Sequence, residues 1–572
     1  MMKFSLLYPE NAERDFCQLN DEAVNDLSLE FILDALTDRH TERPHLLGMM
    51  TKLPTDADTI RYRHEIFDDF LRFPKLREKM SGLVAKLADL RDLERFQMDN
   101  DSSALWSLVN RLREIDDYMS CINMIRDTLS QIPITSSGLI RLREIVNDIA
   151  KESGFEELKA DVDEMMAKAQ QLKSITIGVN LDKLLRPESA GIVALNDTKF
   201  TDSGLMSRFK GFTDKKDDLH HGADLGEGHR YHPANPSTRQ VTMGTYMLSA
   251  ATHDVHIETS NVTGKDPLSN ALRTQVTDIM KRTVADIKST IKRYVNINGY
   301  SLVSLLPEVL FYNRFSELTE KLMGIGMPMC NPVITDFEER SCDFKDVYNL
   351  KLAINKLNGE DINIICNDFA FNDEHRIYIL TGPNRGGKTI FTQAIGLAML
   401  MAQWGVYIPA REARISPCDN IFTHFPADEN ETVDLGRLGE ESQRLSKIFE
   451  IATRYSLLLL NESLATTSVA EGVFIAKDVV KSMRYLGTRA IFNTHMHDLA
   501  RSVDELNNAV EGDSRAESLI TGVHDGERSF KVSIAPPQGV SYAADIAREY
   551  GVTFEQIKQD IDQKHPKEQE RR

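Results

Sequence analysis

The segment TGPNRGGKT, Thr381 to Thr389, carries residues whose types and spacing are typical of a phosphate-binding loop. The pattern G-x-x-x-x-G-K-S/T is met by Gly382, Gly387, Lys388 and Thr389. The glycines let backbone N–H groups turn toward phosphate oxygens at a helix N-terminus, where the helix dipole also favours an anion. In this pattern the lysine pairs with the phosphates and the threonine hydroxyl ligates Mg²⁺. The sequence therefore predicts a nucleotide site between a strand, HRIYIL, and a helix that begins with IFTQ.

A second group of polar residues follows another apolar run. The segment YSLLLLNES predicts a buried strand over Leu457–Leu460 that ends at Asn461 and Glu462. In an ATPase the first position normally holds an acid near Mg²⁺, and the second holds a glutamate that orients the attacking water. Glu462 is thus the predicted catalytic base. Asn461 keeps an acceptor oxygen without the charge, so we expect it to hold Mg²⁺ through water less well and to slow hydrolysis without abolishing it.

The next predicted strand, TRAIFNTH, places His495 at its C-terminal end, where ligand sites of parallel sheets gather. We interpret His495 as a γ-phosphate sensor, and a purely structural histidine is the alternative. Ser468 and Glu471 have the spacing of a capping box. They predict a helix from Val469 to about Leu486, closed by Gly487.

The pattern of apolar and polar residues changes along the chain, and with 572 residues the chain is long enough for two or more domains. Residues 1–345 repeat apolar residues at three- and four-residue steps, apart from an irregular insertion at about 195–265. Residues 346–550 alternate strand and helix patterns, which predicts a mostly parallel sheet with helices on both faces. Residues 551–572 form a charged tail. We expect a multidomain fold with a long helical core and lever region followed by an α/β P-loop ATPase domain.

The formal net charge of −19 argues against a uniformly basic surface, so any contact with nucleic acid must use a local basic face or a closed clamp. The helix pattern LRTQVTDIMKRTVADIKSTIKRYV carries the strongest local basic cluster. Its candidate contacts to a phosphate backbone are Lys281, Arg282, Lys288 and Lys292, and a solvated helix face is the alternative. The histidines of segment 220–232 fit no standard zinc spacing, which favours a solvated loop over a metal site.

Several features of the sequence bear on location. The start, MMKFSLLYPE, has no signal-peptide pattern, and the cysteines include no C-x-x-C pair, as is usual in a reducing compartment. Residues 389–410 are uncharged, but Gln393 and Gln403 and the preceding phosphate loop favour a buried helix over a membrane span. We therefore expect a cytoplasmic protein without a membrane segment.

Taken together, the separated motifs resemble one family, the MutS mismatch-repair ATPases, a branch of the ABC-type ATPases. The likeness covers roughly residues 367–547 and includes TGPNRGGKT, MAQWGVYIPA, DNIFTHFPADEN, EESQRLSKIFEIATRYSLLLLNES, TTSVAEG, FNTH and QGVSYAADIA in the family's order. The resemblance implies an ATPase with ATP and Mg²⁺ as cofactors. It also implies a homodimer whose helical levers form a nucleotide-gated clamp on DNA, in mismatch repair or on branched DNA. The alternative is a nucleotide-switched dimeric interaction protein with slow or no hydrolysis and no DNA specificity.

The resemblance also extends the set of site residues. The expected nucleotide-binding residues are Gly382, Pro383, Asn384, Gly386, Gly387, Lys388, Thr389, Ile390 and Ile365, the last of which would pack on the adenine base. The expected catalytic residues are Glu462, Lys388 and His495. The loop from Gly436 to Glu441 of one subunit would complete the nucleotide site of the other.

The sequence departs from the family pattern at several places. Asn461 replaces the usual Asp, Gly436 replaces a signature Ser, and His424 stands where an Arg is expected. Leu464 lies in what is normally a glycine-rich turn. The chain begins with helical patterns in place of the family's mismatch-reading domain, so it resembles a short form that lacks this domain.

Overall fold

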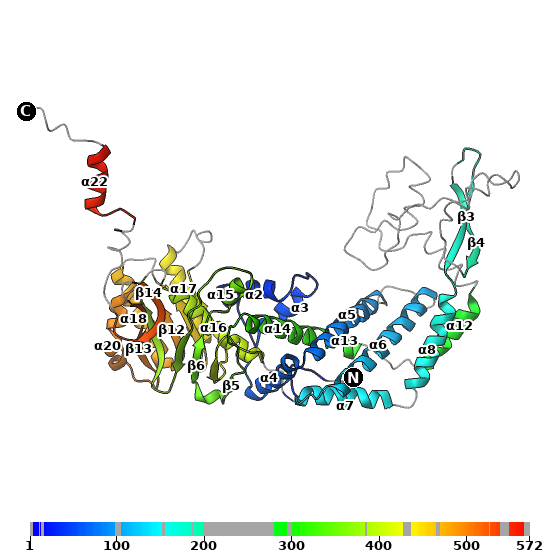
Figure 1. Cartoon of the computed structure of the whole chain (residues 1–572), viewed down its shortest axis with the longest axis horizontal. Coiled ribbons are helices and arrows are strands. Elements are labelled where there is room, and N and C mark those ends of the chain that lie inside the picture. Colours follow the sequence, from blue (N-terminus) through cyan, green and yellow to red (C-terminus); the bar gives the residue numbers. More distant parts are fainter. Residues whose placement is uncertain are drawn as a thin grey trace, which may run out of the picture. The chain divides into compact units, whose positions relative to one another are not determined.

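The computed structural model divides into two compact units that interleave along the chain (Figure 1). Unit 1 combines Met1–Met2, Gly82–Gln131 and Arg143–Leu306, and unit 2 combines Lys3–Ser81, Ile132–Leu142 and Pro307–Arg572. The consecutive division at residue 345 stays a prediction. The structure describes residues 4–10, 12, 16–97, 105–151, 155–185, 187–197, 280–293, 300–383, 386–426, 436–464, 469–524, 527–537, 548 and 550–564.

The larger sheet of unit 2 has six strands in the order β10-β11-β12-β8-β13-β14. All neighbours pair in parallel except β14, which is antiparallel to β13. The alternating pattern of residues 346–550 thus gives the expected mostly parallel sheet, with one antiparallel edge strand. The strands are β8 (His375–Thr381), β10 (Ile421–His424), β11 (Leu457–Asn461), β12 (Arg489–Asn493), β13 (Arg515–His524) and β14 (Glu527–Ile534).

Helices cover both faces of this sheet. On one face, α16 (Lys388–Trp404) packs against β11 and β12. On the other face, alternate strand residues such as Ile377 and Leu458 share a buried apolar cluster with the remaining helices. These helices are α17 (Gly436–Ile451), α18 (Val469–Leu486), α19 (His497–Arg501) and α20 (Val503–Ala509). Helix α18 has the predicted bounds, and Gly487 follows it with a φ of 78°.

Helix α16, which carries no charged residue after Lys388, is buried along almost its whole length. It is buried because it packs against β11, β12, β2 (Lys52–Pro54), α4 (Ala57–Arg72) and β6 (Cys342–Val347). Its Gln403 side chain donates to the carbonyl oxygens of Pro54 and Cys418, both at 2.8 Å. The prediction of a buried helix here is therefore confirmed. No helix within the described ranges combines the length and the apolar character that crossing a membrane requires.

Residues near the N-terminus belong to unit 2, which the helical pattern alone did not indicate. Leu27 packs so closely on α16 that a Cβ added at Gly396 would lie 2.7 Å from it. The Glu308 carboxylate accepts hydrogen bonds from Ser5 Oγ at 2.8 Å and from Leu6 N at 2.6 Å. The helices near the N-terminus are α1 (Asp21–Asp26), α2 (Leu29–Leu36), α3 (Arg43–Met50) and α4 (Ala57–Arg72). Later in the chain lie α14 (Leu306–Gly324), a 3-10 turn at Phe337–Glu339, α15 (Leu350–Leu357) and α22 (Phe554–Lys564).

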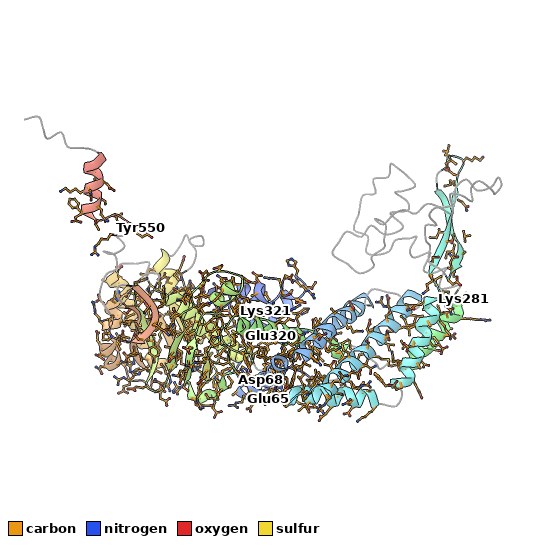
Figure 2. All side chains as sticks on the ribbon, in the orientation of Figure 1. Glu65, Asp68, Lys281, Glu320, Lys321 and Tyr550 are labelled. Atoms are coloured by element: carbon orange, nitrogen blue, oxygen red, sulfur yellow. The ribbon has the colours of Figure 1, made fainter. Side chains whose placement is uncertain are left out.

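Polar contacts within unit 2 involve Asp68 of α4 and Glu320 of α14, both labelled in Figure 2. Arg77 donates to Glu320 at 2.5 Å, and Asn331 donates to Asp68 at 2.9 Å. Unit 2 also holds a four-stranded sheet that the sequence did not predict. Its order is β5 (Val333–Ile334), β9 (Glu412–Ile415), β6 (Cys342–Val347) and β7 (Asn367–Phe371), and a separate pair joins β1 (Phe16–Gln18) to β2 (Lys52–Pro54).

The described residues of unit 1 form helices and one antiparallel hairpin. Helix α12 packs on α6 and α8 through Ile287, which is fully buried. The hairpin pairs residues 174–181 with residues 187–196. The elements are α6 (Leu105–Gln131), α8 (Phe155–Gln170), β3 (Ser174–Leu181), β4 (Pro187–Asn196), α12 (Lys281–Arg293) and α13 (Tyr300–Val303), while α5 (Pro74–Gln97) and α7 (Ser137–Lys151) have residues in both units.

Candidate nucleotide-binding site

The glycine loop joins the end of β8 to the start of α16, as the sequence predicts. Gly382 and Gly387 have φ angles of 148° and 85°, which side-chain-bearing residues rarely adopt. A Cβ at Gly382 would lie 2.0 Å from the Oγ1 atom of Thr521 on β13. Glycine is therefore required at residue 382 by both backbone angle and space. Asn384 lies outside the described residues.

Lys388 is buried at the first position of α16 and turns its ammonium group back over the loop. Its Nζ atom donates to the carbonyl oxygens of Gly382 at 3.2 Å and Pro383 at 3.1 Å. Burial lowers the pKa of Lys388 to about 8, against the opposing attraction of the Glu462 carboxylate. A phosphate at the loop would give this ammonium the anionic partner that the two carbonyls do not supply.

Three polar side chains from different elements meet beside the loop. The Thr389 hydroxyl donates to Asn461 Oδ1 at 2.8 Å, and Asn493 Nδ2 donates to the same oxygen. Asn493 Nδ2 also lies 3.5 Å from Thr389 Oγ1. Asn493 is fully buried, and its Oδ1 atom has no hydrogen-bond partner among the described residues. The sequence did not single out Asn493, although a polar residue at the end of a buried strand was the available signal.

This group of side chains fits a bound Mg²⁺ ion in the chemistry of its donors. Mg²⁺ takes oxygen ligands and keeps several waters, which hydroxyl and amide oxygens can hold. Thr389 and Asn461 supply such oxygens, and the orphan Oδ1 of Asn493 is an acceptor suited to a metal-bound water. The donor set is neutral, so it should hold the ion more weakly than a set that contains a carboxylate.

Glu462 and His495 form a pair at the carboxyl ends of β11 and β12. His495 Nε2 lies 2.8 Å from Glu462 Oε1, and the two side chains are 38% and 36% exposed respectively. The hydrogen bond from His495 lowers the pKa of Glu462, with added attraction from Lys388. Glu462 has a φ of 51°, and its N–H donates to the Asn493 carbonyl at 2.8 Å. An ionised, solvent-facing carboxylate held in this way is able to accept a proton from water.

The turn after Glu462 is held by buried polar contacts in place of glycines. Leu464 is buried with a φ of 64°, and its N–H donates to Glu441 Oε2 at 2.6 Å. His424 Nδ1 lies 2.6 Å from Ser463 Oγ, and burial lowers the pKa of His424 to about 4, so this imidazole is neutral. The Glu441 carboxylate thus acts within its own chain, and its role across a dimer stays a prediction. Helix α17 begins at Gly436, so the segment from Gly436 to Glu441, expected as a loop, forms its first turns.

The predicted adenine-packing and DNA-binding residues lie in other parts of the chain than the group beside the loop. Ile365 is half-buried just before β7, and Ile390 is 40% exposed on α16. Phe530 of β14, which the sequence did not indicate, packs on the loop with its ring 3.2 Å from the position of a Cβ at Gly387. Lys281 and Arg282 are exposed in the first turn of α12, in unit 1 (Figure 2).

Further predictions fall on residues that the structure does not describe, including Ser468 of the predicted capping box. The side chains of Lys288 and Lys292 on α12 are among them, and so is the whole histidine-rich segment 220–232. In the part of the chain that is described, no cluster of three or more histidine, cysteine or acidic side chains has the arrangement of a metal site.

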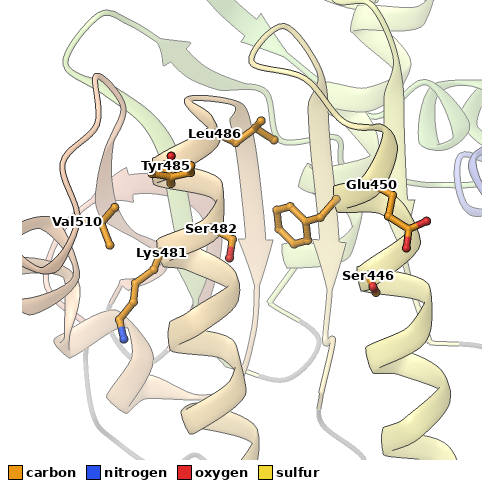
Figure 3. A pocket seen from close by; sticks show the side chains of 8 residues that line it. Ser446, Glu450, Lys481, Ser482, Tyr485, Leu486 and Val510 are labelled. Atoms are coloured by element: carbon orange, nitrogen blue, oxygen red, sulfur yellow. The ribbon is translucent and has the colours of Figure 1, made fainter.

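A separate groove lies between the C-terminal halves of α17 and α18 (Figure 3). These helices lead into β11 and β12, so the groove is at the amino ends of the strands, the edge opposite the glycine loop. It includes none of the predicted nucleotide-binding residues. Its lining residues are Ser446, Phe449, Glu450, Lys481, Ser482, Tyr485, Leu486 and Val510.

Two family models match the chain. Residues 378–551 match MutS domain V, and residues 55–325 match the MutS2 N-terminal domain. The first range contains the glycine loop, β11, β12 and the Glu462–His495 pair, and the second contains most of unit 1.

Curated proteins match over part of the chain. A DNA mismatch repair protein MutS of Oleidesulfovibrio alaskensis is 32% identical over 201 residues, which are 33% of this chain and 21% of that protein. One from Chlorobium chlorochromatii is 35% identical over 159 residues, 28% of this chain and 18% of the relative. A DNA mismatch repair protein MutS 2 of Halobacterium salinarum is 29% identical over 189 residues, 33% and 21% of the two chains. The chain thus spans about a fifth of the length of these relatives.

Proposed function

The chain belongs to the MutS family, and from this we propose that it is an ATP-dependent DNA-binding protein, a nucleotide-gated clamp that acts in DNA mismatch repair or on branched DNA. The observation that carries the proposal is the convergence of Lys388, Thr389, Asn461 and Glu462 at one edge of a parallel sheet. Ligand sites of such sheets gather at this edge. The relatives named above are mismatch-repair proteins, which supports the process.

The proposed reaction is transfer of the γ-phosphoryl group of ATP to water. Lys388 exchanges its two carbonyl partners for phosphate oxygens and pairs with their charge. Thr389 and Asn461 would hold Mg²⁺, which would supply further neutralisation of the phosphates. Glu462 orients the water and takes its proton. His495 senses the γ-phosphate and also holds the Glu462 carboxylate in place. The neutral Asn461 makes turnover slow.

The N-terminal and C-terminal regions of the chain have different roles in this function. Residues 346–550 act as the ATPase domain, and residues 1–345 act as helical core and levers. Two copies form a homodimer in which Gly436 to Glu441 of one copy reach the nucleotide of the other. Lys281 and Arg282 contact the DNA backbone, since they are exposed cations on one helix of unit 1. The place of action is the cytoplasm.

A second function is favoured by the neutral side chain of Asn461 and by the net charge of −19. In this alternative the protein dimerises around ATP and presents its helices to protein partners, with slow or no hydrolysis and no DNA specificity. The two functions differ in how they respond to salt, because contacts to DNA phosphates release counterions and weaken steeply as salt rises.

The deciding experiment measures ATP turnover and DNA affinity with mismatched duplex, matched duplex and four-way junction, each at low and moderate salt. The test variant is Lys281→Ala/Arg282→Ala. The control is Lys75→Ala/Lys79→Ala, which removes the same charge from exposed positions on α5. We expect the test variant alone to reduce the salt slope, by about 0.9 per lost phosphate contact. ATP binding with no response to any DNA would favour the alternative function.

A further inference from the structure

Asn461 has to present a particular end of its side chain to the loop. A carboxylate offers an acceptor oxygen on either side, whereas an amide offers one oxygen and one NH₂ group. In the structure the oxygen of Asn461 faces Thr389, where it accepts the threonine hydroxyl at 2.8 Å. With the amide turned over, an NH₂ group would take the place of this oxygen. An Asn at this position therefore needs a neighbour that fixes its orientation.

The neighbour is Asn493, at the end of the adjacent strand. Parallel pairing of β11 with β12 sets Asn461 directly beside Asn493. The Asn493 NH₂ group donates to Asn461 Oδ1, so a turned Asn461 would bring two NH₂ groups together. Asn461 and Asn493 are buried, at 6% and 0% exposure. Water therefore cannot hydrogen-bond the two facing NH₂ groups, and the free-energy cost of bringing them together remains.

We propose that Asn493 is a positioning residue for Mg²⁺ that this chain needs because residue 461 is Asn. It orients the Asn461 oxygen toward Thr389, where the ion would be held. Its own Oδ1, which is buried without a partner among the described residues, would accept a hydrogen from a water of that ion. Asn461 and Asn493 together thus supply two oriented neutral oxygen acceptors where an Asp at residue 461 would supply one charged carboxylate. This inference rests on the proposed nucleotide site, and it predicts that the substitution Asn461→Asp makes Asn493 dispensable.

The test is a double-mutant cycle of wild type, Asn493→Ala, Asn461→Asp and the double variant. The readout is the Mg²⁺ concentration that half-saturates binding of a fluorescent non-hydrolysable ATP analogue, with the thermal midpoint measured without nucleotide. We expect Asn493→Ala to raise this concentration about 10-fold or more when residue 461 is Asn, the scale of a lost outer-shell partner. In the Asn461→Asp background we expect Asn493→Ala to change it less than about 2-fold, because a carboxylate needs no orientation.

Two further variants separate positioning from folding. Asn493→Leu keeps the volume of the side chain but removes the donor, so it should behave like Asn493→Ala in Mg²⁺ affinity. Asn507→Ala removes another amide of unit 2, whose contacts are with the Ala516 backbone, and should lower the thermal midpoint without changing Mg²⁺ affinity. Rescue of Asn493→Ala by Asn461→Asp supports the proposal, since a purely structural loss would persist in both backgrounds.

The outcomes separate this inference from the proposed function. Equal losses of Mg²⁺ affinity in the wild-type and Asn461→Asp backgrounds, or no loss in either, would overturn the positioning role while leaving ATP binding intact. Absence of Mg²⁺-dependent binding of the analogue by the wild-type chain would overturn the proposed nucleotide site, and this inference with it.

Discussion

Nucleotide affinity should fall steeply as the pH rises above about 8, because Lys388 loses its charge in the free protein. Its ammonium group is buried against the carbonyl oxygens of Gly382 and Pro383, and this burial lowers its pKa to about 8. Phosphates favour the charged form, so the pKa of Lys388 in the complex lies higher. Binding ATP above about pH 8 then requires uptake of a proton, and each pH unit weakens the affinity by up to about tenfold.

The magnitude follows from the fraction of free protein that is charged. With a pKa of about 8, this fraction falls from about three quarters at pH 7.5 to about 3% at pH 9.5, an increase in Kd of about 25-fold. The free energy of unfolding should instead increase as the pH rises through this range. The Lys388 pKa is lower in the folded than in the unfolded chain, so its destabilising effect is present below about pH 8 and is relieved as the pH rises further.

The assay is titration of a fluorescent non-hydrolysable ATP analogue between about pH 7.5 and about pH 9.5 at constant Mg²⁺ and salt. Lys388→Arg is the matched control, because a guanidinium stays charged over this range while the ligand titrates identically. A flat Kd in the wild type would show that the Lys388 pKa is not lowered. An equal slope in Lys388→Arg would assign the effect to another group.

Further predictions concern the loop and the residues around it. Gly382→Ala should abolish analogue binding, whereas Gly359→Ala, also at positive φ but with open space, should only lower stability by about 1–2 kcal/mol, as thermal unfolding would show. Glu462→Gln should slow ATP turnover about 100-fold or more while titrations show analogue binding retained, and equal turnover would remove Glu462 as the base. Glu441→Ala leaves the buried Leu464 N–H without its acceptor and should cost about 1–3 kcal/mol in denaturant unfolding.

Several parts of the site were predictable because a short stretch of sequence encodes them. The glycine loop, the strand before it and the helix after it are contiguous in the sequence, and the spacing from Gly382 to Gly387 and Lys388 identifies the loop. Helix α18 was predicted with its bounds, since its capping residues and closing glycine are local signals. Glu462 and His495 could be placed at strand ends, and the structure joins them.

Other parts of the fold left no local signal. The packing of Leu27 on α16, and with it the inclusion of residues 3–81 in unit 2, depends on contacts between segments far apart in the chain. The short strands of the second sheet were missed because runs such as β5 and β9 are too brief to show a period. A helical pattern indicates that one face of a helix is apolar, but it does not indicate which other element packs against that face.

The sequence by itself determined which residue types are available for phosphate and metal chemistry, including the neutral Asn461, because these are matters of identity and local spacing. Only the tertiary structure decided how they are used. The pairing of β11 with β12 sets Asn493 beside Asn461, the position of β13 leaves no room for a side chain at Gly382, and α17 brings Glu441 to the Leu464 N–H. Each of these contacts arises from strand order and helix packing, which no single stretch of the sequence records.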